Sequence, residues 1–291
     1  MRNSILIFIT IFLPVLAFSQ SKKKLPKRFK LPSELNEVSG LFIKNSNEFW
    51  WHNDSGSLPI LYQTNAKGKL TKTIHLDQIK NIDWEELTHD DKGNIYIGDF
   101  GNNRNNRKDL KIYIYNFENG NLDAINFTYP DQTQFPPPSA ECNFDMEAFF
   151  YYKNQLHLFS KNRLNVGNSF TKHYTLEAQA GEQVAILKDS IYLKNRVVTA
   201  AAISPDKKTV ALLSYTFKRR KPIPKSKASV FVFRDFEGTN FFKGKMKRKK
   251  VPVFIVATQY EALDFLDNKT IFIASEKTKF IKQKGKRLKI K

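Results

Sequence analysis

The sequence predicts an all-β protein, a β-propeller of five four-stranded blades, on three observations. A key residue enters a short apolar strand, and a second apolar strand is centred 11 residues later, as at Glu147 and Leu158. The same frame recurs along the chain at Ser39, Glu85, Glu147, Ala200 and Glu261. No segment carries an apolar period of 3.6 residues over the length of a helix. Fixed spacing inside each repeat with variable spacing between repeats is typical of a propeller, and a sixth blade remains an alternative.

The first repeat, residues 36–81, contains four strand-like runs. The runs are EVSGLFIK, NEFWWHND, PILYQT and LTKTIHL, and short polar or glycine-containing turns separate them. Branched and aromatic residues favour strands, and Asn, Ser and Gly favour the turns between them. This repeat therefore predicts one blade of four antiparallel strands.

Three further complete repeats are expected over residues 82–140, 141–194 and 195–258. Within the second repeat, the stretch QTQFPPPSAE is predicted to be a loop, because proline has no N–H to donate to a sheet. The fifth repeat begins at Tyr260 and is one strand short. The strand-like segment 25–32 is predicted to complete it, since closing the ring removes an exposed sheet edge.

Residues 1–19 predict a signal peptide that is removed on export. Arg2 gives a positive start, an apolar run follows, and Ala17-Phe18-Ser19 is a small-residue cleavage site. An uncleaved membrane anchor is the alternative, which the short run and its interruption by Pro14 disfavour. The remaining chain, residues 20–291, is expected to be a single domain in the periplasm or outside the cell.

The chain is strongly basic, with a formal net charge of +20 at pH 7. The excess is concentrated in three runs, residues 218–227, 243–250 and 277–291. Such runs suit a polyanionic partner, such as nucleic acid, a phosphorylated sugar or lipid headgroups. Alternatively, the basic runs only keep the protein soluble and let it adhere to surfaces, and we favour this interpretation for an exported protein. The runs contain few aromatic residues, so a groove that stacks single-stranded nucleic acid is not indicated. We expect a monomer.

In a propeller whose first strands line the channel, the repeated key positions should form a ring at one mouth. Three glutamates and a serine would meet there, and close carboxylates repel one another unless a cation joins them. Calcium is the predicted cation, because it prefers oxygen ligands and the ring contains no cysteine or histidine. The predicted metal ligands are Ser39, Glu85, Glu147 and Glu261. The alternative is a water-filled channel in which these side chains cap backbone amides.

A second set of polar residues lies where the second strand of each repeat ends, on the same face of the predicted propeller. The candidates for catalysis there are Asp54, Asp99, Lys161, Arg163 and Glu276. Together they could form a pocket for a polar ligand, with a metal ion bridging ligand and protein. The alternative is that NDSG and GDFGNN are simply tight-turn sequences. HExxH, GxSxG and GxGxxG motifs do not occur in the sequence.

Several phrases of the sequence resemble a group of uncharacterised exported proteins of Bacteroidota. They include EVSGL, WWHNDSG, DWEEL, YIGDFGNN, DMEAFFYY, LFSKNR and ALLSY, and the likeness covers residues 36 to about 276. The phrases are also similar to those of the SdiA-regulated and phytase-like-esterase propeller proteins. An axial ring of Glu and Ser is similar to that of the calcium-activated apyrases, which are five-bladed. That resemblance implies calcium at the four ring residues named above, whereas Ala200 departs from the pattern.

Three functions are compatible with these observations. The favoured one is an exported propeller that holds an axial calcium ion and binds a ligand or partner. The alternative is a metal-dependent phosphoesterase of the phytase or apyrase type, in which the ion polarises the phosphoryl oxygen and activates water. The third is a structural adhesion domain that acts through its basic edges. Whether the protein is an enzyme depends on an open metal position with a base in reach, which sequence spacing does not define.

Overall fold

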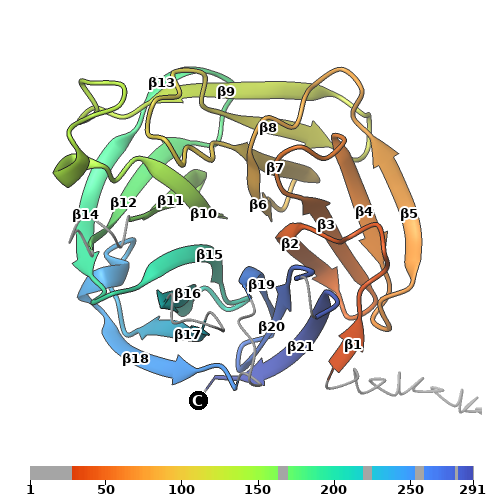
Figure 1. Cartoon of the computed structure of the whole chain (residues 1–291). Coiled ribbons are helices and arrows are strands. Elements are labelled where there is room, and N and C mark those ends of the chain that lie inside the picture. Colours follow the sequence, from red (N-terminus) through yellow and green to blue (C-terminus); the bar gives the residue numbers. More distant parts are fainter. Residues whose placement is uncertain (1–27, 163–169, 219–224, 253–258, 279–280, 291) are drawn as a thin grey trace, which may run out of the picture.

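Five small β-sheets surround a central axis in the computed structural model of the chain (Figure 1). The structure describes residues 28–162, 170–218, 225–252, 259–278 and 281–290. Within these residues the regular elements are β-strands and short 3-10 turns, and no helix is long and apolar enough to cross a membrane. The fold is a five-bladed β-propeller, as the repeats predict. The predicted signal peptide, residues 1–19, lies outside the described residues.

Each blade is a sheet whose successive strands pair antiparallel, with the first strand nearest the axis (Figure 1). The first blade contains β2 (Val38–Asn45), β3 (Glu48–Asn53), β4 (Ile60–Thr64) and β5 (Leu70–His75). The second contains β6 (Trp84–His89), β7 (Asn94–Asp99), β8 (Lys111–Asn116) and β9 (Leu122–Thr128). The third contains β10 (Asp145–Tyr152), β11 (Gln155–Lys161), β12 (Phe170–Glu177) and β14 (Ile186–Tyr192). The fourth contains β15 (Val197–Ile203), β16 (Thr209–Lys218), β17 (Lys225–Arg234) and β18 (Lys245–Lys250). The fifth begins with β19 (Tyr260–Asp267) and β20 (Thr270–Ser275).

Apolar side chains from neighbouring blades pack against one another and form the core. Phe49 and Trp51 of β3 contact Phe272 of β20, with ring centroids 5.3 and 6.1 Å apart. Phe100, which follows β7, packs edge-on against Phe149 of β10 at 5.2 Å. Because side chains alternate along a strand, each strand gives every second residue to such a layer. The core is therefore divided among the blade interfaces, and the first strands can carry polar groups at the axis.

The N-terminal strand completes the fifth blade, and this prediction is confirmed. β1 (Arg28–Lys30) pairs antiparallel with β21 (Lys284–Lys289), which lies beside β20. The chain after β1 is anchored as well: Leu31 is buried, and Gln283 donates a hydrogen bond to the carbonyl of Pro32 at 2.7 Å. The two ends of the described chain are thus joined in one sheet, and the ring has no open blade.

Removing residues 20–33 should therefore lower the melting temperature sharply. The truncation exposes the outer edge of β21 and takes Leu31 out of the core, and loss of a buried leucine alone costs roughly 2 kcal/mol or more. Differential scanning calorimetry of the full and truncated proteins measures the difference. Equal melting temperatures would show that the ring does not depend on this closure.

The structure differs from the predicted repeats at the end of the third blade. The sequence predicts one strand over residues 182–193, but the chain is divided at Ala185. β13 (Gly181–Val184) pairs in parallel with β9 and adds a fifth strand to the second blade, whereas β14 stays in the third. The N–H of Ala185 donates to the carbonyl of Thr128 at 2.9 Å. By pairing with β9, β13 satisfies backbone N–H and C=O groups at the outer edge of the second blade. No local sequence pattern reveals this pairing between blades.

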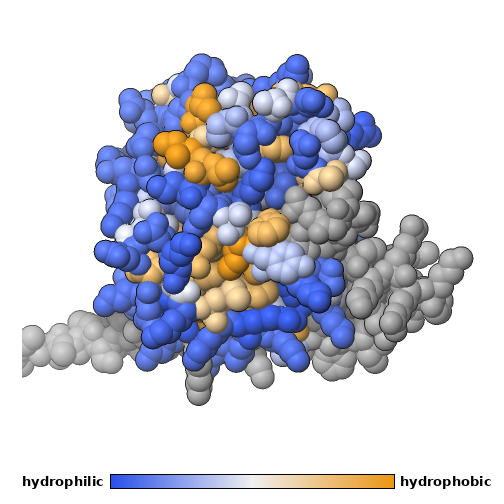
Figure 2. Space-filling model, turned by 90° about the vertical axis from the view of Figure 1, so that its left-hand side faces the viewer, coloured by the Kyte–Doolittle hydropathy of each residue, from blue (hydrophilic) through white to orange (hydrophobic). Residues whose placement is uncertain are grey.

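The outer edges of the third and fourth blades are protected in different ways. β14 exposes large apolar side chains, including Ile186 and Leu187, and Figure 2 shows this side of the ring, where apolar residues interrupt a mostly hydrophilic surface. A register shift against β12 leaves Lys188 as an extra residue in β14. β18, part of the predicted basic run 243–250, carries five Lys or Arg in six exposed residues. A bulge and a row of like charges both hinder edge-to-edge pairing with a second chain.

Candidate metal centre at the propeller mouth

The first strand of every blade is irregular at the same place. Register shifts fall between Val38 and Leu41, Trp84 and Glu86, Met146 and Ala148, Val198 and Ala200, and Tyr260 and Ala262. The polar residues inside these bulges are Ser39, Glu85, Glu147, Thr199 and Glu261, and all are buried. A β-bulge changes the direction of a side chain relative to the regular strand. The repeated bulge is therefore the structural reason that a polar residue recurs at this position.

In the fourth blade the ring position is Thr199, and the prediction of Ala200 is wrong. The turn between β15 and β16 is one residue longer than the turn between β6 and β7. The bulge residue of the fourth blade therefore lies one position earlier than the 11-residue spacing predicts. Ala200 lies instead in the core between the fourth and fifth blades. The hydroxyl of Thr199 donates to the carbonyl of Tyr260 at 2.9 Å, and that of Ser39 donates to the carbonyl of Glu85 at 2.6 Å. Both ring hydroxyls thus join their blade to the next one.

Glu147 has a counter-charge within the protein. Lys161, at the end of β11, forms an ion pair with it, and the side chains of Glu147 and Lys161 are 3% and 19% exposed. Burial by itself lowers the pKa of Lys161, but Glu147 and Asp145 outweigh burial and raise that pKa well above its usual range. Lys161 is therefore charged at neutral pH. Lys161 therefore supplies part of the positive charge that the predicted calcium ion was expected to bring to the ring of glutamates.

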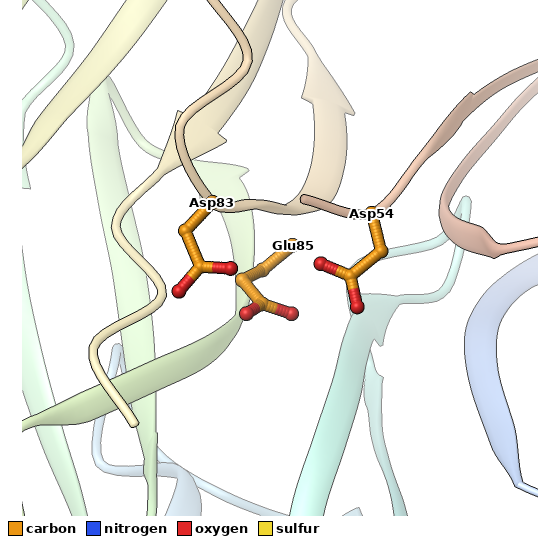
Figure 3. A group of neighbouring side chains, drawn as sticks. All are labelled: Asp54, Asp83 and Glu85. Carbon is orange, nitrogen blue, oxygen red and sulfur yellow. The ribbon is translucent and has the colours of Figure 1, made fainter. Parts of the chain in front are cut away.

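Three other carboxylates gather on the side of the mouth formed by the first two blades. Asp54 follows β3, Asp83 precedes β6, and Glu85 is the bulge residue of β6. One carboxylate oxygen from each lies within 4.8 Å of the others, and Figure 3 shows the three carboxylates side by side. Glu85 is only 4% exposed, and no donor among the described residues hydrogen-bonds to its carboxylate. We call Asp54, Asp83 and Glu85 the carboxylate trio.

The space beside the carboxylate trio depends on Gly101. A Cβ at this position would lie 2.2 Å from Oε1 of Glu85 and 2.5 Å from Cγ of Asp83, closer than non-bonded atoms approach. Any side chain here would force the two carboxylates to move. Glycine therefore allows the backbone to pass close to the acids without displacing them.

Asp99 holds the backbone beside the carboxylate trio in place. It is fully buried, and its Oδ1 accepts hydrogen bonds from the backbone N–H of Asp83 at 3.1 Å and from Arg107 at 3.0 Å. Arg107 also donates to the carbonyl of Gly101 at 2.9 Å. The carboxylate of Asp99, a predicted catalytic candidate, is thus engaged in holding the two backbone segments that frame the trio.

Two more glutamates lie on the fifth-blade side of the mouth. Nε2 of Gln259 is 3.4 Å from Oε1 of Glu261 and 3.3 Å from Oε2 of Glu276, so one amide serves both carboxylates. Burial, followed by the charge of Glu276, raises the pKa of Glu261 to about 8. Burial, followed by the charge of Asp54, raises the pKa of Glu276 to about 8. Burial and Glu261 also raise the pKa of the neighbouring Tyr215 hydroxyl.

The pKa values of the carboxylate trio show that nearby positive charge does not compensate its negative charge. Burial and the charge of Asp54 raise the pKa of Asp83 to about 6. Burial and the charge of Glu147 raise the pKa of Glu85 well above its usual range. Carboxylates that resist ionisation because they are buried together ionise readily once a cation joins them. The mouth is therefore an acidic region on a protein whose formal net charge is +20.

The structure separates the predicted site residues into distinct groups. Asp54 and Glu85 belong to the trio, Glu147 and Lys161 form the ion pair, Glu261 and Glu276 share Gln259, Ser39 and Asp99 bond to neighbouring backbone, and Arg163 lies outside the described residues. The predicted metal ligands therefore share only Glu85 with the trio. The ring exists at the mouth, but its members have different partners.

Asp83 is the functional candidate that sequence reasoning missed. It lies two positions before a ring residue, as Glu37 and Asp145 do in other blades. Asp145 is also buried at the mouth, and its Oδ1 accepts the N–H of Asn102 at 2.7 Å. The recurrence of an acid two residues before the bulge, in three of five repeats, is the signal that could have identified it.

Comparisons with known proteins establish the architecture only. No protein-family model and no curated protein matches the sequence. Among solved structures, the α-L-arabinanase of Penicillium chrysogenum complexed with arabinobiose is similar with a TM-score of 0.50 and 9% identity, over 90% of this chain and 96% of that one. Hydrazine synthase of Kuenenia stuttgartiensis gives a TM-score of 0.42 and 12% identity, over 84% of this chain and 57% of that one. The Dos1 propeller gives a TM-score of 0.41 and 10% identity, over 81% of this chain and 52% of that one. The chain thus spans about half the length of the last two.

Proposed function

We propose that the carboxylate trio binds a calcium ion, and that this exported propeller uses the loaded mouth to hold a ligand or partner. The observation that carries the proposal is the buried Glu85 carboxylate, which faces Asp54 and Asp83 and has no hydrogen-bond donor among the described residues. An unpaired buried carboxylate costs several kcal/mol unless it is neutralised. A divalent ion would neutralise it and its two neighbours together.

Calcium suits these residues better than a transition metal. The trio offers only carboxylate oxygens, and calcium takes six to eight oxygen ligands in a flexible arrangement. Three carboxylates leave coordination positions for water or for a ligand. The ion would lie off the axis, towards the first two blades, because Lys161 already neutralises Glu147 on the other side.

Ligand binding is favoured over hydrolysis of phosphate esters. A phosphate would approach a mouth in which Asp54, Asp83 and Glu85 ionise when calcium binds, and Lys161 is already paired with Glu147. A bound ligand that presents hydroxyls or an amine to this mouth meets no such repulsion. Metal-dependent hydrolysis remains the second candidate, with the same ion as Lewis acid.

Calcium should raise the melting temperature of the metal-stripped protein. An ion that binds only the folded state stabilises it by about 3 kcal/mol at a hundredfold excess over its dissociation constant. Asp83→Asn should lose most of this response, because it removes one charged ligand and keeps the volume. Asp91→Asn, on an exposed turn of the second blade, is the matched control and should respond like the wild type.

The same preparations distinguish binding from hydrolysis. They are incubated with a panel of phosphomonoesters and phosphodiesters, with calcium or with chelator, and free phosphate is measured. Calcium-dependent release that Asp83→Asn abolishes would favour the phosphoesterase. A melting temperature that is indifferent to calcium and chelator would contradict both functions.

We also propose that the basic runs 218–227, 243–250 and 277–291 bind polyanions through surface charge. The support is β18, whose six residues are all exposed and include five Lys or Arg. Retention on a heparin column should fall steeply as salt rises, because bound counterions are released on association. It should be unchanged in Asp83→Asn, since the mouth is not involved. Retention that is insensitive to salt would contradict this proposal.

A further inference from the structure

A second hollow lies on the face of the ring opposite the mouth. It is a groove of about 850 Å³ between the fourth and fifth blades, lined by the turn after β15, the segment after β17 and the turn after β19. The first strands begin near the mouth and end at these turns, so the groove and the carboxylate trio occupy opposite ends of the blades. Nothing in the proposed calcium site depends on this groove.

The groove carries unpaired positive charge. Its four cationic side chains are Lys207, Lys208, Arg234 and Lys269. In the part of the chain that the structure describes, none of them forms an ion pair with a carboxylate. The two acids of the groove are already engaged: Asp235 pairs with Lys245 at 3.0 Å, and Asp206 accepts the hydroxyl of Ser204 at 2.6 Å. Arg234 donates a hydrogen bond to the carbonyl of Ile290 at 3.4 Å, which leaves its charge uncompensated. Four cations without a carboxylate partner favour an anionic ligand.

Lys207 occupies a backbone conformation that favours glycine. Its φ is +59° in the turn between β15 and β16, and the residue at the same place in the turn between β6 and β7 is Gly93, with a φ of +85°. Each of the two lies three residues after the residue that opens its turn, Ser204 for Lys207 and Asp90 for Gly93. A lysine in this region is strained relative to glycine, so its presence suggests use of the side chain. Lys207 lies at the inner end of the groove, next to the channel.

The other lining residues indicate what kind of anion fits. Tyr152 and Phe236 offer flat apolar surfaces, and Asn268 offers an amide that can donate and accept. Asp206 and Asp235 would repel a ligand made only of phosphates, but each can accept hydrogen bonds from hydroxyls. A sugar chain with acidic groups meets all of these features at once. We propose that this groove binds an acidic oligosaccharide, whose carboxylate or sulfate groups pair with the four cations.

The test is calorimetric titration of the full mature protein with three probes. The probes are trigalacturonate, a chondroitin sulfate tetrasaccharide and the uncharged chitotriose. One of the two acidic probes should bind with a one-to-one stoichiometry. Binding of trigalacturonate shows that carboxylates suffice, whereas the chondroitin sulfate probe offers both carboxylate and sulfate groups. Lys207→Gly combined with Lys269→Ser should weaken that binding by about tenfold or more, since two charge-assisted contacts are lost.

A matched control separates the groove from general surface charge. Lys247→Ser combined with Lys249→Ser removes the same charge from β18 of the same blade and should change the affinity by less than about twofold. Lys207→Gly is compatible with the left-handed backbone, so its melting temperature should equal or exceed that of the wild type. Equal losses in both double variants, equal binding of chitotriose, or no binding of either acidic probe would overturn the proposal.

Discussion

Replacing Lys161 by methionine should destabilise the protein by about 3–5 kcal/mol at mildly alkaline pH, because it leaves Glu147 buried and unpaired. The loss should shrink as pH falls, since Glu147 can then take up a proton in place of its partner. Urea unfolding in the presence of chelator, followed by tryptophan fluorescence, measures the change. The chelator ensures that no bound ion takes over the role of the lysine.

The double variant Lys161→Met with Glu147→Gln is the matched control for this experiment. It removes both charges together, so most of the lost stability should return. A single variant as unstable as the double one, or a loss that does not depend on pH, would show that Lys161 acts by packing and not by its charge. In that case the mouth would lack the counter-charge described here.

Glu261→Gln should stabilise the calcium-free protein by up to about 4 kcal/mol at about pH 9 and should change little near pH 5. The folded-state pKa of Glu261 is raised from 4.5 to about 8, so the folded protein holds this proton over a range where the unfolded chain releases it. The stability linked to this group is therefore fully present below about pH 4.5 and is lost as pH rises through about 8. Glutamine mimics the protonated form and avoids that loss.

The comparison is made at each pH between the variant and the wild type, which cancels groups that titrate equally in both. His52 and His157 are among these groups, because burial lowers their pKa values to about 4 and about 3. They remove stability from both proteins as pH falls below about 6.5. Glu118→Gln, at an exposed position of the second blade, controls for the loss of one surface charge. A stability difference for Glu261→Gln that is the same at both pH values would contradict the proposed environment of this residue.

The architecture was predictable because its signal is repeated. Four of the five hairpins present the same spacing between a polar residue and a second apolar strand, and the fourth blade differs by one residue, so the copies support one another. The missing last strand also pointed to β1, because an incomplete blade leaves an unpaired edge. β13 could not be predicted, because residues 182–193 read as one strand and only the tertiary position of β9 divides them.

The site was predictable in its place but not in its pairings. Recurrence identified Glu85 and Glu147 as facing one mouth, and both are there. It could not show that Lys161 reaches Glu147 within the third blade whereas Glu85 faces Asp83 and, from the first blade, Asp54, because both arrangements depend on the direction in which each side chain points. The fourth blade was misread by one residue for a simpler reason: a longer turn changes the spacing without changing the bulge. Bulge position, not strand spacing, defines the ring.

The central claim is that the carboxylate trio, and not the whole ring of glutamates, is the calcium site. Calorimetric titration of metal-stripped protein with calcium tests it most directly, using Glu85→Gln and the double variant Glu147→Gln with Lys161→Met. We expect one ion per chain in the wild type, loss of binding in Glu85→Gln, and retained binding in the double variant. No heat of binding in the wild type, or loss of binding in the double variant as complete as in Glu85→Gln, would contradict it.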